Sequence, residues 1–167
     1  RNKVQFPVSQ GKQGLAVGYY RPRSHDVLDA PDCPLQPEAV TRLRAAFKGW
    51  MEAHRVPPYS EGTGRGLIRH LYVRASSRGE SLVCVVANGD SLPNGSALTD
   101  ALRQAEPGLA GVVLNTNTRD TNVILGDRYD TLWGRDWLEE DLCQLTFRLS
   151  VPSFFQITRD QTERLYR

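Results

Sequence analysis

The chain has 167 residues, of which 40% are hydrophobic and 24% are charged, and its formal net charge at pH 7 is +2. These values are ordinary for a globular protein, and the length suffices for one hydrophobic core, or for one domain and a piece of the next. No apolar run approaches the roughly 20 residues of a membrane span, so we expect no contact with a membrane.

Positive charge is concentrated at the N-terminal end. Residues 1–25 contain no acidic residue, and their basic residues are Arg1, Lys3, Lys12, Arg21 and Arg23. A locally basic end suits a surface that contacts a phosphate backbone. On charge alone, a solvated pair of strands with charged edges is the simpler interpretation.

Residues 4–8 and 15–20 have the apolar pattern of two strands, joined by a glycine-containing linker. The second strand runs into the sequence GYYRPR at residues 18–23, which places two aromatic rings beside two guanidinium groups. Aromatic faces stack on unpaired bases and arginines bind phosphates, as in the recognition of single-stranded RNA. Alternatively, one tyrosine packs inward and the arginines only solvate the strand end.

A helix is predicted after Pro37, because apolar residues recur there at helical spacing: Val40, Leu43, Phe47, Trp50 and Met51. Strands are predicted at 67–75 and 82–87, a short helix near Ser96, and a buried strand at 109–114. Counting residues 15–20 as the first strand, the order is that of the ferredoxin-like plan. We therefore predict an α+β fold, an antiparallel sheet with two helices on one face.

The predicted strand at 67–75 carries His70, Tyr72 and Arg74 on one face. Such a face can stack on and hydrogen-bond RNA, or it can pack beneath a helix with its polar tips at the rim. The polar segment 115–122 is typical of a structured loop. Farther along, residues 123–125 and 129–133 flank Gly126-Asp127-Arg128, a pattern that predicts a β-hairpin.

Residues 133–141 are predicted as a connector and 144–150 as a further strand. Thr158 and Gln161 then stand three apart, a spacing that predicts the start of a helix. The sequence has no initiator methionine, and this last helix has barely begun at Arg167. We therefore expect the chain to be a fragment from the middle of a longer protein.

Six blocks of the sequence resemble the RNA uracil-5-methyltransferases, and among them most closely the branch that acts on large-subunit (23S) ribosomal RNA. The blocks are residues 1–8 (RNKVQFPV), 18–25 (GYYRPRSH), 32–35 (DCPL), 67–70 (LIRH), 121–126 (TNVILG) and 153–157 (SFFQI). The resemblance implies a cytoplasmic, monomeric parent enzyme that uses S-adenosyl-L-methionine to make 5-methyluridine. The implied substrate is ribosomal RNA in preference to transfer RNA, and the implied role is in rRNA processing.

The resemblance also implies a division into domains. Residues 1–122 correspond to a central RNA-recognition domain, and residues 123–167 to a β-hairpin extension that leads into a truncated methyltransferase domain. In the family, the nucleophilic cysteine follows an Asp-Pro-Pro-Arg motif and the cofactor lies on a glycine-rich turn, and neither motif occurs here. We therefore expect no catalytic residue in this fragment and no activity from it alone. The alternative is a freestanding RNA-binding or interaction module without methyltransferase chemistry.

For two residues of the last block, the resemblance implies a specific role. Gln156 matches a glutamine that contacts S-adenosylmethionine, and Phe154 matches an aromatic residue near the flipped base. Packing at a domain junction is the alternative for Phe154 and Phe155. Thr158 stands where the family usually has asparagine, so an amide contact is lost there. For phosphate contacts we predict Arg1, Lys3, Arg21 and Arg23.

Cys33 matches the last of four thiolate ligands of the 4Fe–4S cluster that some family members carry. A cluster needs several thiolates, and the three cysteines of the chain, Cys33, Cys84 and Cys143, are far apart. We therefore expect Cys33 to bind metal only in a parent that has upstream cysteines, and no cluster in the fragment. Widely spaced cysteines in odd number also indicate a reducing compartment such as the cytoplasm.

Overall fold

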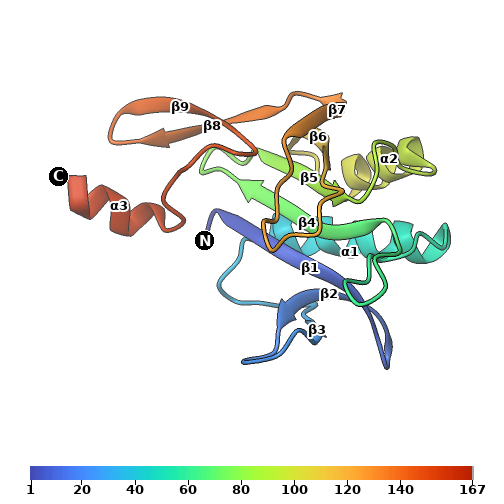
Figure 1. Ribbon diagram of the computed structural model, residues 1–167. Helices are drawn as coiled ribbons and strands as arrows, with labels where there is room; N and C mark the ends of the chain where they lie inside the picture. Colours follow the sequence, from blue (N-terminus) through green and yellow to red (C-terminus); the bar gives the residue numbers. More distant parts are fainter. Residues whose placement is uncertain (167) are drawn as a thin grey trace.

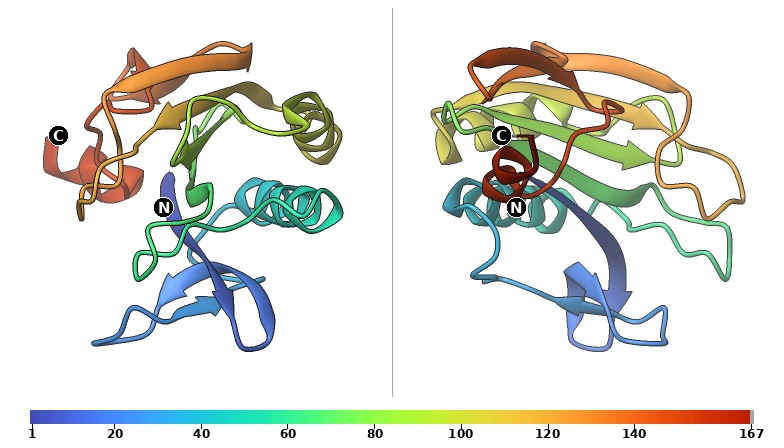
Figure 2. Two further views of the ribbon diagram at one scale, coloured as in Figure 1. Left: turned by 45° about the vertical axis from the view of Figure 1, so that its right-hand side comes forward. Right: turned by 90° about the vertical axis from the view of Figure 1, so that its left-hand side faces the viewer.

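The structure is a computed structural model that describes residues 1–166. Arg167, the last residue of the predicted C-terminal segment, lies outside the described residues. A large twisted sheet lies between a pair of helices on one face and a β-hairpin on the other, and a third helix follows at the end of the chain (Figures 1 and 2).

The main sheet has seven strands in the order β3-β2-β1-β4-β5-β6-β7. Within the described residues, β5 and β6 are its one parallel pair. A smaller two-stranded sheet consists of β8 and β9. The elements are β1 (Lys3–Gly11), β2 (Gly14–Tyr20), β3 (Val27–Asp29), α1 (Glu38–Ala53), β4 (Ile68–Ala75), β5 (Ser81–Ala87), α2 (Gly95–Ala105), β6 (Leu109–Thr116), β7 (Arg128–Gly134), β8 (Trp137–Leu142), β9 (Leu145–Ser150) and α3 (Arg159–Tyr166).

Helices α1 and α2 cover one face of the sheet. The apolar stripe predicted for the first helix is buried throughout, and α2 adds Leu98 and Leu102 to the same core. The stripe packs against alternate residues of the central strands, among them Leu71 of β4 and Val85 of β5. Burying a large apolar side chain contributes about 1.5–3 kcal/mol. The helical periodicity thus correctly predicted this core.

The opposite face of the sheet is covered by the β8–β9 hairpin. Leu82, Cys84 and Val86 of β5 point toward it and pack with Leu138 and Leu149. Every residue of β5 is buried as a result, which explains why its sequence is an unbroken apolar run rather than an alternating one.

The α+β class, the mostly antiparallel sheet and the two helices on one face are confirmed, whereas the strand order differs from the ferredoxin-like plan. That plan splits each βαβ unit with an intervening strand. Here β5 and β6 are direct neighbours, and β1 pairs antiparallel with β4. The physical reason is that the chain enters α1 from the short edge strand β3, so that β1 lies between β2 and β4.

The hairpin predicted around Gly126 is wrong, and the hairpin of the extension is formed by β8 and β9 instead. Residues 123–125 form no strand, and β7 pairs with β6. The side chains of Asn115 and Asn117 form hydrogen bonds with backbone groups of residues 123–126. These backbone groups are therefore not available for the strand pairing of a hairpin. The predicted connector contains β8, and its turn has two residues with positive φ, Cys143 at 49° and Gln144 at 67°, the backbone of a tight two-residue turn.

Candidate nucleic-acid interface

The N-terminal end of β1 and the segment before α3 lie side by side (Figure 1). The backbone nitrogen of Asn2 donates to the oxygen of Ile157 at 2.9 Å, and its side-chain Nδ2 donates to the backbone oxygen of Gln156 at 3.0 Å. The structure therefore brings Arg1 and Lys3 to the same end of the sheet as Phe154 and Gln156.

The two phenylalanines of this segment face different surroundings. Phe155 is half-buried, and its ring centroid lies 5.8 Å from that of Phe147 at the hairpin. Phe154 is 83% exposed. The side chain of Gln156 is exposed as well, although its backbone is held by Asn2. Phe155 thus takes the packing role, whereas Phe154 and Gln156 are presented outward.

Arg74 holds the turn that precedes Phe154. Its guanidinium is buried, and Nη2 donates to the backbone oxygens of Ser153 at 2.6 Å and Val151 at 3.4 Å, and to the Tyr72 hydroxyl at 2.8 Å. The Tyr72 hydroxyl in turn donates to Val151. Of the two alternatives for this strand face, packing is the correct one for Tyr72 and Arg74, but the covering element is the β8–β9 hairpin with the segment after it, and not a helix.

Lys3 lies directly across from Arg74 in the pairing of β1 with β4. Burial and the charge of Arg74 lower the pKa of Lys3. No acidic partner of Lys3 is found among the described residues. Arg74 has no ion pair in the described part of the chain either, so two unpaired cations lie side by side at this end of the sheet, where Glu140 and Asp160 line the surface next to Arg1.

Arg21 and Arg23 lie elsewhere, in the connection between β2 and β3 at the far edge of the sheet, and both are exposed. Of the two tyrosines before them, Tyr19 packs inward, with its ring 5.5 Å from that of Phe6 and its hydroxyl bonded to Gln36. Tyr20 is 46% exposed. The structure therefore splits the predicted phosphate contacts into two groups, and no contact between the groups is seen in the described part of the chain.

Beside Tyr20 is a hollow that sequence reasoning missed. It measures about 290 Å³ and is lined by Tyr20 and His25, by Tyr59 from the loop before β4, and by Arg69 and His70 of β4. We call it the aromatic hollow. Arg69 and His70 belong to one of the six blocks that resemble the family, but Tyr59 lies outside these blocks and in no sequence pattern that would predict a site. It reaches the site because its backbone nitrogen donates to Ile68.

Residues 117–122 of the polar segment form a structured loop, as its composition predicted, whereas Asn115 and Thr116 are the last residues of β6. Asn117 accepts a hydrogen bond from the backbone of Arg119 and donates to the oxygens of Val123 and Ile124. Arg69 Nη1 donates to the backbone oxygens of Asn117 and Arg119 at 2.8 and 2.7 Å. The loop is thus fixed to the rim of the aromatic hollow through Arg69.

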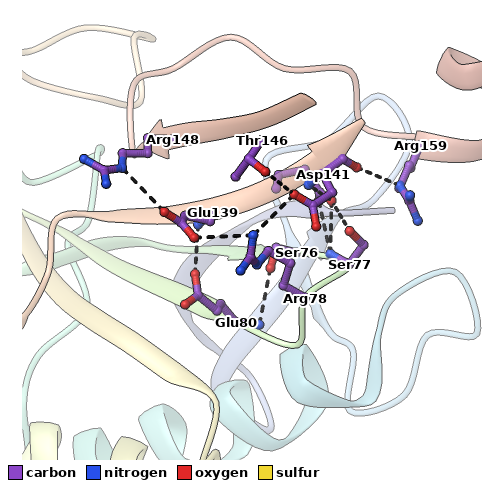
Figure 3. A network of polar contacts seen from close by, with 10 residues as sticks. Ser76, Ser77, Arg78, Glu80, Glu139, Asp141, Thr146, Arg148 and Arg159 are labelled. Atoms are coloured by element: carbon purple, nitrogen blue, oxygen red, sulfur yellow. Dashed lines mark hydrogen bonds and ion pairs between the residues drawn. The ribbon is translucent and has the colours of Figure 1, made fainter. Parts of the chain in front are cut away.

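The acidic run at residues 139–141 has a structural role (Figure 3). Glu140 is buried and accepts hydrogen bonds from the backbone and hydroxyl of Ser77, while Arg78 lies between Glu139 and Asp141 at 3.5 and 3.4 Å. Arg159 of α3 donates from Nε to the backbone oxygen of Asp141 at 3.0 Å. These contacts tie the β8–β9 hairpin to the β4–β5 turn and to α3.

Cys33 is half-buried next to Tyr19, and burial together with the Cys33 side chain raises the pKa of the Tyr19 hydroxyl. Cys84 lies in the core at β5, and Cys143 in the turn of the hairpin. Across residues 1–166, no three His, Cys, Asp or Glu side chains come together to hold a metal ion. An iron–sulfur cluster requires several thiolates, so the residues of this chain by themselves do not fit one.

No helix in the described part of the chain has the length and apolar character needed to cross a bilayer. The longest, α1, has 16 residues and a polar outer face.

The comparisons with known proteins agree on one class of relative. No protein-family model matches the chain. It is 34% identical over 167 residues to an uncharacterized RNA methyltransferase of Clostridium acetobutylicum, and 36% identical over 169 residues to one of Staphylococcus epidermidis. These matches cover 99% and 100% of this chain but only 36% and 37% of the relatives.

A solved structure has the same fold. The crystal structure of Pyrococcus abyssi tRNA (uracil-54, C5)-methyltransferase, in complex with S-adenosyl-L-homocysteine, matches with a TM-score of 0.78 and 19% sequence identity. The match covers 99% of this chain and 39% of that protein. The predicted resemblance to RNA methyltransferases is therefore confirmed: the chain is similar along its whole length to proteins named RNA methyltransferases, and it spans a little over a third of the length of these relatives.

Proposed function

We propose that the chain is the central RNA-recognition part of an S-adenosylmethionine-dependent RNA (uracil-C5) methyltransferase that acts on ribosomal RNA. The observation that carries this proposal is the presentation of Phe154 and Gln156. Both side chains are exposed on a segment that Arg74 and Asn2 hold in place. A structural filler would be buried, whereas a fixed backbone with free side chains suits contacts with a ligand. The relatives' names and the shared fold support the same class.

In this proposal the chain has two parts. Residues 1–122, which contain β1 to β6, hold the RNA. Residues 123–167 form the extension and the start of the methyltransferase domain. The RNA contacts are Phe154 with Arg1 and Lys3 at one end of the sheet, and Arg21 and Arg23 at the β3 edge. We further propose that the protein acts as a monomer in the cytoplasm.

Gln156 is the one residue that we assign to the cofactor. Its side-chain amide is exposed and can both donate and accept a hydrogen bond, which fits one contact to S-adenosylmethionine and not a complete binding site. When bound, that cofactor would supply the methyl group. We assign no catalytic residue to this chain. Cys33 would bind a cluster only with thiolates from elsewhere in the parent protein.

The proposal is tested by RNA binding and methyl transfer, measured separately. The chain alone should bind ribosomal RNA fragments in a salt-sensitive way, because phosphate contacts release counterions, and it should transfer no methyl group. The parent protein should methylate a uridine in ribosomal RNA, with transfer RNA as the comparison substrate. Methylation by the chain alone, or no RNA binding at low salt, would contradict the proposal.

The alternative is a freestanding RNA-binding or interaction module. It predicts that the natural reading frame contains no Asp-Pro-Pro-Arg-type motif and no glycine-rich cofactor turn. Sequencing the whole reading frame therefore separates the two functions without any assay.

A further inference from the structure

The aromatic hollow has the composition of a nucleobase site. Two tyrosines from different elements line it, Tyr20 of β2 and Tyr59 of the loop before β4. The guanidinium carbon of Arg69 lies 4.3 Å from the centroid of the Tyr59 ring, a cation–π contact, and Asn117 and Arg119 fix Arg69 from behind. Tyr59 and Arg69 are thus held in place before any ligand arrives, which lowers the entropy cost of binding.

His70 gives the same hollow a group with unmet hydrogen-bonding capacity. Its Nδ1 is buried and has no hydrogen-bond partner within the described residues. Burial and the neighbouring Arg69 lower the pKa of His70 to about 4, so the ring is neutral at pH 7. A neutral imidazole has one donor and one acceptor nitrogen, the complement of the polar edge of a base.

A second hollow adjoins the first and supplies positive charge. It measures about 480 Å³ and shares Ser9, Gln10, His25 and Val27 with the aromatic hollow. We call it the basic hollow, because its lining contains Lys12, Arg21 and Lys48.

Acidic residues also line the two hollows: Asp26 and Asp29 the basic hollow, and Glu61 the aromatic hollow. Asp29 pairs with Arg44 and, at 2.8 Å, with Lys48. Glu61 lies 3.8 Å from His25, and Asp26 is exposed. Lys12 and Arg21 have no ion pair among residues 1–166, so they are the cations available to a ligand.

We infer that the two hollows form one binding surface for single-stranded RNA. Unpaired bases stack on both Tyr20 and Tyr59 in the aromatic hollow, and a neighbouring phosphate contacts Lys12 and Arg21 in the basic hollow. The identity of the polymer rests on the proposed function, whereas the surface itself is separate from Phe154 and Gln156. Single strands are favoured over duplexes, because a stacked base must first be unpaired.

The test uses fluorescence anisotropy of the chain with a labelled single-stranded RNA of ten nucleotides. Tyr20→Leu and Tyr59→Leu should each weaken binding by about 5- to 150-fold, the equivalent of about 1–3 kcal/mol per stacked base. Tyr20→Phe keeps the ring and should bind like the unaltered chain. Matching thermal unfolding of Tyr20→Leu and Tyr20→Phe would confirm that both fold.

Charge is tested on the same RNA at several salt concentrations. Lys12→Ser combined with Arg21→Ser should reduce the slope of log affinity against log salt by about 1.4, because each lost phosphate contact on a single strand contributes about 0.7. Arg103→Ser on α2 removes an exposed positive charge outside both hollows and should leave the slope unchanged.

The outcomes separate this inference from the proposed function. If Phe154→Ala weakens binding and Tyr20→Leu and Tyr59→Leu do not, the hollows are not the site, although the chain still recognises RNA. If an acidic peptide competes fully with the RNA and the tyrosine variants bind both equally well, the basic hollow is a peptide surface and the inference is overturned. If the chain binds no RNA at all, both proposals fail.

Discussion

The guanidinium group of Arg74, on β4, donates a hydrogen bond of 2.6 Å to the backbone oxygen of Ser153, which lies 79 residues farther along the chain. A buried charge is costly unless its donors are paired, yet the Nε and Nη1 atoms of Arg74 have no partner in the described part of the chain. Its Nη2 atom alone makes the contacts to the segment before Phe154. Arg74 is therefore a positioning residue for that segment.

Replacing Arg74 should loosen the segment. In Arg74→Met the charge-assisted hydrogen bond to Ser153 is lost, a contribution of about 1.5–3 kcal/mol. We expect amide hydrogen exchange at residues 153–157 to accelerate about tenfold or more, while exchange in α1 changes less. The matched control is Tyr72→Phe, which removes one hydroxyl and keeps the guanidinium. Equal exchange at residues 153–157 in Arg74→Met and the unaltered chain would show that Arg74 does not position the segment.

Stability should fall in mildly acidic solution because of His70. Its pKa is about 4 in the folded chain against an ordinary value of 6.5, so between these values the unfolded chain binds more protons. The part of the free energy of unfolding that depends on neutral His70 is present in full above pH 6.5 and is lost as the pH falls toward 4. It amounts to roughly 3 kcal/mol. Urea unfolding at pH 7, 6, 5 and 4.5 measures this loss.

His70→Asn should flatten the pH dependence of the free energy of unfolding between pH 6.5 and 4. The pKa values of Asp29 and Glu80 are also lowered, but these two groups change the free energy of unfolding at lower pH, because their ordinary pKa values are 3.8 and 4.5. Unaltered pH dependence in His70→Asn would contradict the assignment.

Gln156→Ala should separate cofactor binding from RNA binding. The side chain is exposed, so we expect the free energy of unfolding of the chain to change by less than about 0.5 kcal/mol. In the parent protein the substitution should raise KM for S-adenosylmethionine and leave the Kd for RNA unchanged. Phe154→Ala is the counterpart, with weaker RNA binding and an unchanged KM for the cofactor. If Gln156→Ala instead weakened RNA binding and Phe154→Ala raised KM for the cofactor, the two residues would have the opposite roles.

The cysteines should differ in reactivity. Burial raises the pKa of the Cys84 thiol far above its ordinary range, and the thiolate is the reactive form. Cys33 and Cys143 are half-buried. With a disulfide reagent at pH 8, we expect two thiols to react in the native chain and the third only after unfolding in urea. Cys84→Ala should leave the native count at two, and a native count of three would mean that β5 opens readily.

The elements with local periodicity could be predicted from the sequence. The stripe from Val40 to Met51 and the run from Leu82 to Ala87 each identified a buried face correctly. The strand β8 was missed because its inward positions include Glu140, whose burial depends on Ser77, 63 residues away. The sheet order was missed because β3 has three residues and no pattern of its own.

In the candidate site, too, some features could be predicted from the sequence and others depend on tertiary contacts. Phe154 and Gln156 were identified by resemblance, and both side chains are exposed, while the roles predicted for them stay predictions. The aromatic hollow could not be predicted, because Tyr20 lies far from Tyr59 and Arg69 in the sequence. The three meet through the pairing of β1 with β2 and β4 and through the hydrogen bond from Tyr59 to Ile68. Local pattern identifies which faces are buried, and tertiary pairing decides which exposed groups become neighbours.

The bond between Asn2 and Gln156 joins residues 154 positions apart. During synthesis of the protein, the first strand leaves the ribosome long before its partner segment exists. Contacts of such separation form late, because the closure of a long loop must be offset by other contacts first. We therefore expect the surface around Phe154 to form late, after the core beneath α1 and α2 is complete, because the buried residues of that core all lie between Val4 and Leu114.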